Sequence, residues 1–252
     1  MITLTNLEKI YRTKEIETVA LENVNLTVDR GEFLSIMGPS GCGKSTLLNI
    51  IGLLDAPTYG TVEIAGVNTI NMNDKQLAEF RNQKLGFVFQ SFHLINSLNV
   101  LDNVELPLLY RKVSAKERRA AAEAVLEKVG LSHRMRHFPT QLSGGQCQRL
   151  ALARALLHDS PVYLFDEASS NIDVESETDV MAQIHQLAKT KTVILISHRL
   201  VHVADADRIY VMDGGRVVES GSHEQLLSTG GHYAKLWAAQ QELEHYVKKV
   251  HA

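Results

Sequence analysis

The sequence lacks the cysteine patterns of disulfide-stabilised and zinc-binding proteins. It has two cysteines among 252 residues, Cys42 and Cys147, which are far apart and form no CxxC pair. Zinc sites and disulfide frameworks need several suitably spaced cysteines, so neither is indicated and two reduced thiols are expected. The first residues also lack a basic stretch followed by an apolar one, and no secretory signal is expected.

Long apolar runs and an excess of positive charge are missing as well. The longest apolar stretch, 47–54, is interrupted by Asn49 and Gly52, whereas a membrane span needs about 20 consecutive apolar residues. Lys and Arg number 26 against 29 Asp and Glu, which gives a net charge of −3. Because nucleic-acid binding depends on clustered positive charge, nucleic acid is not an expected partner.

The pattern of apolar residues predicts an α/β fold. Short apolar runs alternate with turn residues over the first 70 positions, and helical periodicity dominates 94–155. Apolar strands then return after position 160, with a helix near 175–189 between the first two of them. Strands that alternate with helices predict a mostly parallel sheet with helices on both faces. The N-terminal strands and the 94–155 segment add an antiparallel β part and a helical insertion.

One glycine-rich segment indicates a phosphate-binding loop. Residues 38–45 fit the pattern G-x-x-x-x-G-K-[ST] and lie between an apolar strand and a helix. In such a loop, backbone N–H groups wrap the phosphates, Lys44 reaches the outer phosphates and the Ser45 hydroxyl ligates Mg²⁺. The alternative is a glycine-rich turn with an incidental lysine. The residues expected to bind ATP here are Gly38, Ser40, Gly41, Cys42, Gly43, Lys44, Ser45 and Thr46.

A second strand supplies the acidic groups that such a loop needs. The apolar run 161–165 ends in Asp166 and Glu167. Asp166 is expected to hold Mg²⁺, and Glu167 to act as the base for the water that attacks the γ-phosphate. The competing interpretation is a charged strand end that simply meets solvent.

A third motif narrows the class of P-loop protein. Residues 142–146 read LSGGQ and precede a helix-like run, so Ser143, Gly145 and Gln146 form a second glycine turn at a helix start. With this motif in place, the chain resembles the ATP-binding subunits of ABC transporters over nearly its whole length. The resemblance implies a P-loop NTPase of the RecA-like type, with one domain over 1–252. Its nucleotide-binding core would be 1–90 and 156–230, its helical subdomain 91–155, and its C-terminal helix 231–252.

The resemblance also implies roles for four more residues. Tyr11 resembles the aromatic that stacks on adenine, and Gln90 the glutamine that links metal and water to the helical region. Asp173, in SSNID, resembles the D-loop aspartate, and His198 the switch histidine that touches the γ-phosphate. Taken alone, Tyr11 and His198 are ordinary residues at strand ends, and Asp173 is a helix N-cap that can also have the D-loop role.

The family's assembly implies partners for this chain. Two cassettes close head to tail around two ATP molecules, and Ser143 and Gly145 of one donate to the γ-phosphate held by the other. Residues 1–150 resemble the lipoprotein-releasing and macrolide-export branch, while 160–252 resemble cassettes fused to exporter membrane domains. A natural gene and an engineered chimera both fit this division. The segment 90–110, which faces the permease in the family, belongs to the first branch.

These observations favour the motor subunit of a transporter, an ATPase that drives a separate membrane permease from the cytoplasmic face of the membrane. The resemblance to the first branch implies a permease for lipoprotein release or for macrolide or peptide export. Two other functions compete with this interpretation. One is a soluble ABC ATPase that acts on ribosomes, DNA repair or chromosomes, and the other is a nucleotide-regulated adaptor without turnover.

Overall fold

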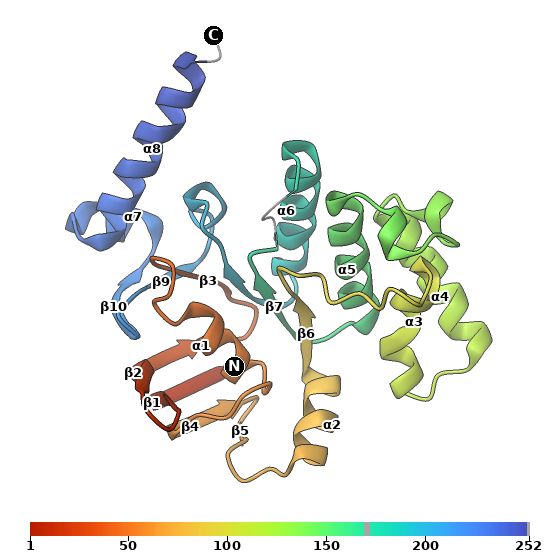
Figure 1. The fold of residues 1–252 in the computed structure, drawn as a ribbon, viewed down its shortest axis with the longest axis horizontal. Helices are drawn as coiled ribbons and strands as arrows, with labels where there is room; N and C mark the ends of the chain where they lie inside the picture. The colour runs from red at the N-terminus through yellow and green to blue at the C-terminus, as the bar shows by residue number, and fades with distance from the viewer. Residues whose placement is uncertain (169–171, 251–252) are drawn as a thin grey trace. The chain divides into compact units, whose positions relative to one another are not determined.

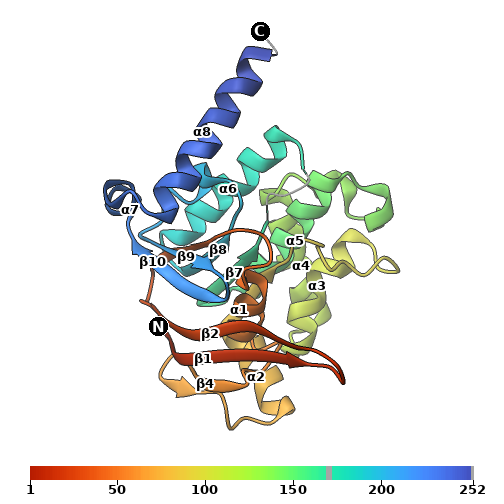
Figure 2. The same ribbon diagram turned by 60° about the vertical axis from the view of Figure 1, so that its left-hand side comes forward.

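The computed structural model describes residues 1–168 and 172–250, and it divides into two compact units. The first unit combines the two ends of the chain, Met1–Asn71 and Ile194–Ala252, and the second is Met72–Val193. The chain enters the second unit after β5 and leaves it within β8 (Thr192–Ile196). Figure 1 labels the helices and most of the strands, and Figure 2 also labels β8.

The first unit is built mainly from strands. Its other elements are β1 (Ile2–Arg12), β2 (Glu17–Val28), β3 (Phe33–Met37), α1 (Lys44–Ile51), β4 (Tyr59–Ile64), β5 (Val67–Asn68), the 3₁₀ turn η3 (Leu200–His202), β9 (Arg208–Asp213), β10 (Arg216–Gly221), α7 (His223–Thr229) and α8 (His232–Val250).

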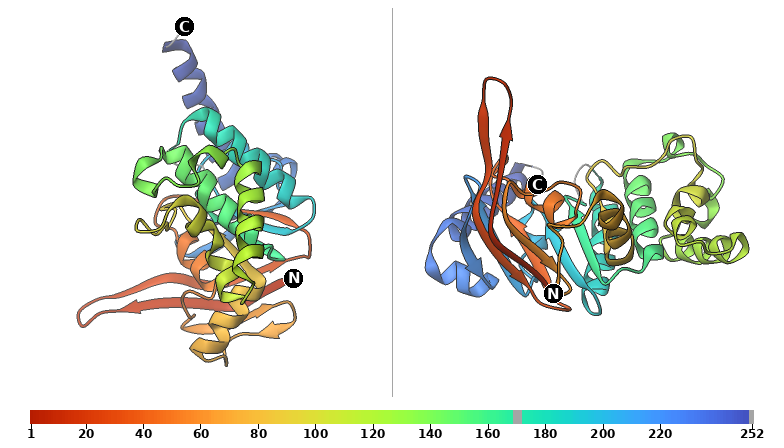
Figure 3. Two further views of the ribbon diagram at one scale, coloured as in Figure 1. Left: turned by 90° about the vertical axis from the view of Figure 1, so that its right-hand side faces the viewer. Right: turned by 90° about the horizontal axis from the view of Figure 1, so that it is seen from below.

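Four strands of this unit form an antiparallel sheet in the order β2-β1-β4-β5. Alternate side chains at the start of β1 are buried, including Ile2 and Leu4, which is the pattern of a sheet with one face toward the core. Figure 2 shows β1, β2 and β4 side by side, and Figure 3 shows the β1–β2 hairpin extending beyond β4. The predicted antiparallel part near the N-terminus is therefore present.

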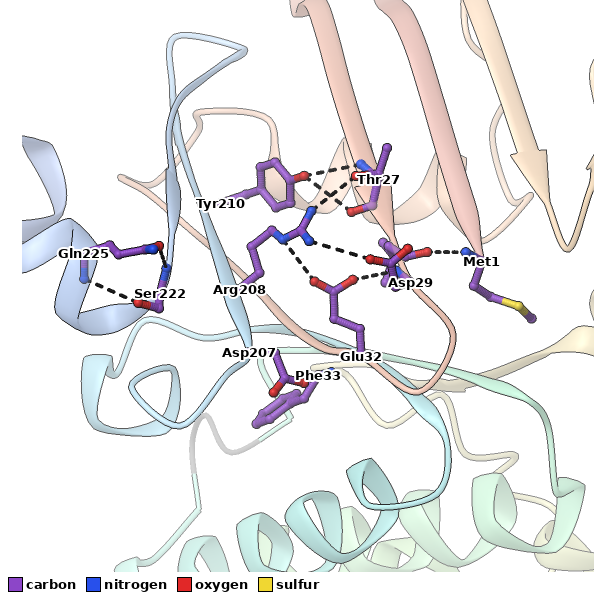
Figure 4. Close-up of polar contacts among 11 residues, drawn as sticks. Met1, Thr27, Asp29, Glu32, Phe33, Asp207, Arg208, Tyr210, Ser222 and Gln225 are labelled. Atoms are coloured by element: carbon purple, nitrogen blue, oxygen red, sulfur yellow. Dashed lines mark hydrogen bonds and ion pairs between the residues drawn. The ribbon is translucent and has the colours of Figure 1, made fainter.

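Three further strands place the P-loop and the C-terminal segment. β3 pairs in parallel with β9, and β9 pairs antiparallel with β10. Side chains of β9 also bind the end of β2, as Figure 4 shows. The Arg208 guanidinium lies 3.1 Å from a Glu32 carboxylate oxygen, 3.7 Å from Asp29 and 3.2 Å from the Thr27 hydroxyl, and the Tyr210 hydroxyl meets the Thr27 backbone. These contacts fix β9 against the N-terminal strands.

The C-terminal helix α8 is anchored at its first turn. A Glu219 carboxylate in β10 accepts hydrogen bonds from the backbone N–H groups of His232 and Tyr233. The fully buried Tyr233 places its hydroxyl 2.6 Å from His223 Nδ1, and the His223 ring meets the Trp237 ring edge-on at 4.5 Å. The helix expected at 231–252 therefore exists over His232–Val250, and its start is packed against the unit.

The second unit is mostly helical. Its elements are α2 (Asp74–Lys84), β6 (Leu85–Val88), α3 (Val100–Tyr110), α4 (Ala115–Lys128), the 3₁₀ turns η1 (Ser132–Arg134) and η2 (Pro139–Gln141), α5 (Gly144–His158), β7 (Val162–Asp166) and α6 (Val174–Ala188).

Helices α3, α4 and α5 share one apolar core. They bury residues at helical spacing, among them Val104 of α3, Leu126 of α4 and Leu150 of α5, all without exposed surface. Each helix starts with a polar side chain that caps its N-terminus, for example Ser114 before α4. The predicted helical insertion is therefore present. Within residues 1–168 and 172–250, no helix has both the length and the apolar character needed to cross a membrane.

The structure confirms the predicted α/β class: its helices accompany strands that pair in parallel, as β3 with β9 and β6 with β7, and antiparallel, as β9 with β10. The helix expected near 175–189 is α6. Helix α2 and strand β6 were not predicted as elements, because β6 has only four residues and α2 buries none of its side chains. The functional boundaries at 90, 155 and 230 remain predictions.

Candidate functional site

The predicted phosphate-binding loop follows a fully buried strand and opens helix α1. All five residues of β3 are buried, and the loop leaves its carboxyl end at Gly38. Gly38 has φ +148°, and a Cβ there would lie 2.1 Å from the Met212 carbonyl oxygen of β9. Only glycine fits this position, so the loop backbone passes directly against β9.

The start of α1 has no side-chain cap. Its N-cap residue is Gly43, which has φ +102° and makes no side-chain capping hydrogen bond. The first N–H groups of a helix have no partner within the helix, and they carry the positive end of its dipole. The predicted loop residues Ser40, Gly41 and Ser45 are exposed beside this start. An uncapped helix start with exposed polar residues is suited to bind an anion.

Lys44 lies in the loop and is held by backbone carbonyls. Its side chain is buried, and Nζ donates to the Gly38 oxygen at 2.9 Å and to the Pro39 oxygen at 2.8 Å. Cys42 Sγ, also buried, lies 3.8 Å from Nζ. These contacts orient the ammonium group along the loop, so its charge adds to that of the helix start. Cys42 fills space inside the loop.

The predicted adenine-stacking residue, Tyr11, lies near the end of β1 and is 44% exposed. Its hydroxyl donates to an Asp55 carboxylate oxygen at 2.9 Å and also meets the side chain of Thr46 in the first turn of α1. Partial burial and the Asp55 carboxylate raise the pKa of Tyr11. The structure therefore brings Tyr11 and the phosphate-binding loop together.

The predicted switch histidine, His198, is exposed and follows β8. The hydroxyl of Ser35 in β3 donates to the Leu195 carbonyl of β8 at 3.2 Å, which links the strand leading to the P-loop with the strand leading to His198. Beyond the histidine, Gln240 of α8 accepts a hydrogen bond from the Leu200 backbone N–H at 3.0 Å. The P-loop, Tyr11 and His198 all belong to the first unit.

In the second unit, two neighbouring strands carry Gln90 and the acidic pair. β6 and β7 pair in parallel with Val88 opposite Phe165. Gln90 and Glu167 each follow their strand's paired residue by two positions, so both leave the same edge of the sheet. Asp166 is the last residue of β7 and is partly buried. The strand register therefore places Gln90 and Glu167 at the same edge of the sheet, and their roles and that of Asp166 remain predictions.

The backbone of Glu167 is strained. It has φ +49°, in the left-handed region that non-glycine residues seldom adopt. Such strain costs on the order of 1–3 kcal/mol and occurs preferentially at functional sites.

Arg154 holds the segment that follows Gln90, and sequence reasoning missed it. From α5, its guanidinium donates to the carbonyl oxygens of His93 at 2.7 Å and Phe92 at 2.9 Å. Both carbonyl residues have positive φ, and burial lowers the pKa of Arg154. The only available signal was its place in the helix-like run after LSGGQ, which also contains Arg149. Arg154 connects the LSGGQ helix to the segment after Gln90.

The LSGGQ motif forms the start of α5 with a complete capping box. The Ser143 hydroxyl accepts from the Gln146 N–H at 3.3 Å, and the Gln146 side chain accepts from the Ser143 N–H at 3.0 Å. The S-x-x-Q spacing signals this cap in the sequence. Ser143 and Gln146, both predicted nucleotide ligands, therefore bind each other.

Gly145 and Asp173 meet at the contact between α5 and α6. A Cβ on Gly145 would lie 2.2 Å from the Ser176 hydroxyl and 3.2 Å from an Asp173 carboxylate oxygen. Asp173 is the N-cap of α6 and accepts from the Ser176 N–H at 2.9 Å, and this hydrogen bond lowers the pKa of Asp173. The capping role is thus present. Residues 169–171 of the predicted D-loop, SSNID, lie outside the described residues.

Comparison with known proteins identifies the family. Residues 21–170 match the family model described as ABC transporter. The chain is 47% identical to an uncharacterized ABC transporter ATP-binding protein, YvrO, of Bacillus subtilis, over 87% of this chain and 96% of that protein. It is 39% identical to the macrolide export ATP-binding/permease protein MacB of Hyphomonas neptunium, over 89% of this chain but only 35% of that protein.

A solved structure agrees with these matches. The ATP-binding cassette MJ0796 from Methanocaldococcus jannaschii, in a dimeric post-hydrolysis state bound to ADP and Pi, aligns with a TM-score of 0.85 and 41% identity. The alignment covers 88% of this chain and 99% of that one. With the matching model spanning more than half its length, the chain belongs to the ABC transporter family, as a nucleotide-binding cassette and ATPase.

Proposed function

We propose that the chain is the MgATP-hydrolysing motor subunit of a lipoprotein-release or macrolide/peptide export system. It works as a homodimer on the cytoplasmic face of the membrane and drives a separate permease. The uncapped start of α1, with Lys44 held along the loop, is the observation that carries the nucleotide site. MacB, which matches this chain over 35% of its own length, is named as an ATP-binding/permease protein for macrolide export and gives the class of cargo.

Within this proposal, the P-loop binds the phosphates and Tyr11 stacks on adenine. Loop N–H groups and Lys44 contact the β- and γ-phosphates. The donors available for the metal are the Ser45 hydroxyl, the Gln90 amide oxygen and the Asp166 carboxylate, all hard oxygen ligands of the kind that Mg²⁺ prefers. When bound, Mg²⁺ neutralises charge on the phosphates.

Glu167 and His198 serve the hydrolytic step. Glu167 accepts a proton from water as the water oxygen bonds to the γ-phosphorus, and the bond to the β-phosphate oxygen breaks to give ADP and phosphate. His198 donates a hydrogen bond to the γ-phosphate. The strained backbone of Glu167 supports this role, because such strain occurs preferentially at functional sites.

Two copies complete the site in this proposal. Ser143 and Gly145 of one copy contact the γ-phosphate bound by the other, and Asp173 lies beside them. The similar cassette MJ0796 is dimeric with ADP and Pi, which supports a homodimer. The permease contact is assigned to 90–110, where Ile95, Leu109 and Tyr110 expose 43%, 51% and 74% of their surface. Contiguous apolar patches mark protein-binding surfaces, and the neighbouring Leu109 and Tyr110 would contribute to one here.

Glu167→Gln tests the motor function. We expect the variant to lose at least about 100-fold in ATPase rate, because the base is removed while the phosphate contacts remain. It should also elute as a dimer from a sizing column only when ATP is present. Glu175→Gln is the matched control, since Glu175 is exposed in the first turn of α6 and should leave both properties unchanged. Full turnover in Glu167→Gln would contradict the proposal.

Copurification tests the partner. A tagged chain expressed in its native host should retain a membrane permease of the export or lipoprotein-release type in a detergent extract. The double variant Leu109→Asp and Tyr110→Asp should lose that permease and keep basal ATPase activity. Recovery of ribosomal or DNA-repair proteins in place of a permease would favour the soluble ABC ATPase.

A further inference from the structure

Asp55 belongs to none of the predicted motifs, but its carboxylate contacts Tyr11, the residue predicted to stack on adenine, and the nearby Lys9. It lies just after the C-terminal end of α1 and is partly buried. One carboxylate oxygen accepts from Lys9 Nζ at 2.6 Å, and the other accepts from the Tyr11 hydroxyl at 2.9 Å. Lys9 also donates to the Ala56 carbonyl at 2.7 Å. Asp55 therefore joins two side chains from the same face of β1.

The segment that carries Asp55 is itself fixed to β1. The Thr58 backbone N–H donates to the Glu8 carbonyl at 2.8 Å, and the Thr58 hydroxyl accepts from the Ile10 N–H at 2.9 Å. At its other end, the Asp55 N–H donates to the Asn49 carbonyl of α1 at 3.3 Å. The carboxylate thus has a rigid support, which a residue needs if it is to orient another.

Lys9 covers one face of the Tyr11 ring. Its ammonium nitrogen lies 4.9 Å from the ring centroid, within the range of a cation–π contact. The Lys9 side chain is only 12% exposed, whereas Tyr11 as a whole is 44% exposed. One ring face is therefore occupied by a fixed cation, so a base would have to stack on the opposite face.

The charge states suit this arrangement. Burial acts to raise the pKa of the Asp55 carboxyl, but the hydrogen bonds from Lys9 and Tyr11 outweigh it and lower that pKa. Burial and the Asp55 carboxylate raise the pKa of Tyr11. At neutral pH the Tyr11 hydroxyl is the donor and the Asp55 carboxylate is the acceptor, as the contact requires.

We propose that Asp55 and Lys9 are positioning residues that clamp Tyr11, so that adenine stacks on the ring face opposite Lys9. The inference rests on the proposed adenine role of Tyr11. A free tyrosine side chain would have to be ordered when the base binds, and this ordering would weaken affinity. The clamp orders the ring in advance, while the contact of the Tyr11 hydroxyl with Thr46 keeps it beside the phosphate-binding loop.

The test compares Tyr11→Ala, Tyr11→Phe and Asp55→Asn in the full chain. Stacking on a base is worth about 1–3 kcal/mol, so Tyr11→Ala should raise the KM for ATP by about tenfold. A single hydrogen bond contributes less free energy than stacking does. Tyr11→Phe and Asp55→Asn should therefore each raise the KM for ATP by only about three- to fivefold. The double variant should be no worse than either of these two, because both remove the same contact. These changes should appear in KM rather than in kcat.

Inorganic tripolyphosphate separates positioning from general damage. It carries phosphates without a base, so its affinity, measured by calorimetry, should be the same in Asp55→Asn as in the unaltered chain. Glu17→Gln is the matched control, since it removes the exposed ion pair with Arg12 at 2.9 Å in the same hairpin and should not change KM. Parallel losses for ATP and tripolyphosphate would overturn the clamp.

The remaining outcomes separate the clamp from the proposed function. If Tyr11→Ala weakens ATP binding while Tyr11→Phe and Asp55→Asn do not, stacking stands and the clamp is wrong. If Tyr11→Ala has no effect, the adenine role of Tyr11 is wrong and the clamp fails with it.

Discussion

Two helix starts in this chain follow glycine-containing motifs, and they differ in what satisfies their N–H groups. Helix α1 begins after Gly43 in a left-handed conformation without any side-chain cap. Helix α5 begins after Ser143 with a complete capping box formed with Gln146. At α1 no side chain occupies the first N–H groups, whereas at α5 the capping box occupies two of them, the N–H groups of Ser143 and Gln146.

This difference assigns the two motifs different tasks. The α1 start, with Lys44 beside it, is suited to hold nucleotide in a single copy of the chain. At the α5 start, the capping box already uses the N–H groups of Ser143 and Gln146, which leaves fewer backbone donors for a phosphate than at α1. We therefore expect α1 to determine affinity for nucleotide, and α5 to contribute mainly when two copies close.

The last residue of α5, His158, is also held by side-chain contacts within its unit. His158 has Nε2 3.0 Å from the Asn82 Oδ1 and Nδ1 in contact with the Ser160 hydroxyl. His158 is 7% exposed. Burial first, and then the nearby Arg111 charge, lower the pKa of His158 to about 4. The helix that carries the signature motif is thus fixed at both ends by polar side chains.

Lys44→Ala gives the largest expected effect on the α1 start. The variant should lose at least about 100-fold in ATPase rate, because a positioned charge on the transferred phosphate is removed. ATP binding measured by calorimetry should weaken as well. Lys75→Ala, at an exposed site in α2, is the control and should change neither quantity. Near-normal turnover in Lys44→Ala would remove the distinction between the two helix starts.

Acid should weaken the anchored end of α5. The pKa of His158 is about 4 in the folded chain and about 6.5 in the unfolded one, so between these pH values only the unfolded state binds the proton. The contribution of His158 to the free energy of unfolding is therefore fully present above about pH 6.5. It is lost as the pH falls from about 6.5 to about 4, and the total loss is about 3 kcal/mol. Urea unfolding across this range should show a steeper loss of stability in the unaltered chain than in His158→Gln. The exposed-site variant His133→Gln is the control and should lose stability with falling pH as steeply as the unaltered chain. If His158→Gln loses stability equally steeply, His158 is not the cause of the pH dependence.

Gly145→Ala should disturb the α5 start by overpacking. Its Cβ would lie 2.2 Å from the Ser176 hydroxyl and 2.6 Å from the Ser176 Cβ. Crowding of this kind costs about 1–3 kcal/mol, measurable as a lower urea midpoint. The double variant Gly145→Ala and Ser176→Gly should recover most of the loss. If it does not, the close approach of α5 and α6 is not the cause.

Ser143→Ala should have the smallest effect on stability and the most informative effect on activity. Loss of a cap costs about 1 kcal/mol. The isolated chain should bind ATP as before, because the capped start is not the nucleotide site within one copy. The ATP-dependent dimer, formed in the Glu167→Gln background, should be weaker. Ser222→Ala removes an equivalent capping box at α7 and should leave the dimer intact. Weaker ATP binding by the Ser143→Ala monomer would contradict the assignment.

Much of the fold was predictable because its signals are local. Buried strands such as β3 and β7 appear as continuous apolar runs, and α6 appears as a periodic helix. The capping box at Ser143 was equally local, yet the motif's resemblance to an anion site obscured it. By contrast, the contacts of Asp55 with Tyr11 and of Arg154 with Phe92 join positions 44 and 62 residues apart. No periodicity of 2 or 3.6 residues encodes such contacts.

The sequence by itself determined the chemistry of the phosphate-binding loop, because glycine spacing, one lysine and a hydroxyl are local requirements of phosphate binding. It also determined the acidic strand end, since an apolar run followed by two carboxylates needs no distant residue to be identified. Only the tertiary structure decided that Lys9 and Asp55 hold Tyr11, and that Gln90 and Glu167 leave the same sheet edge. Strand register and long-range side-chain contacts set these arrangements, and both arise from how the whole chain packs.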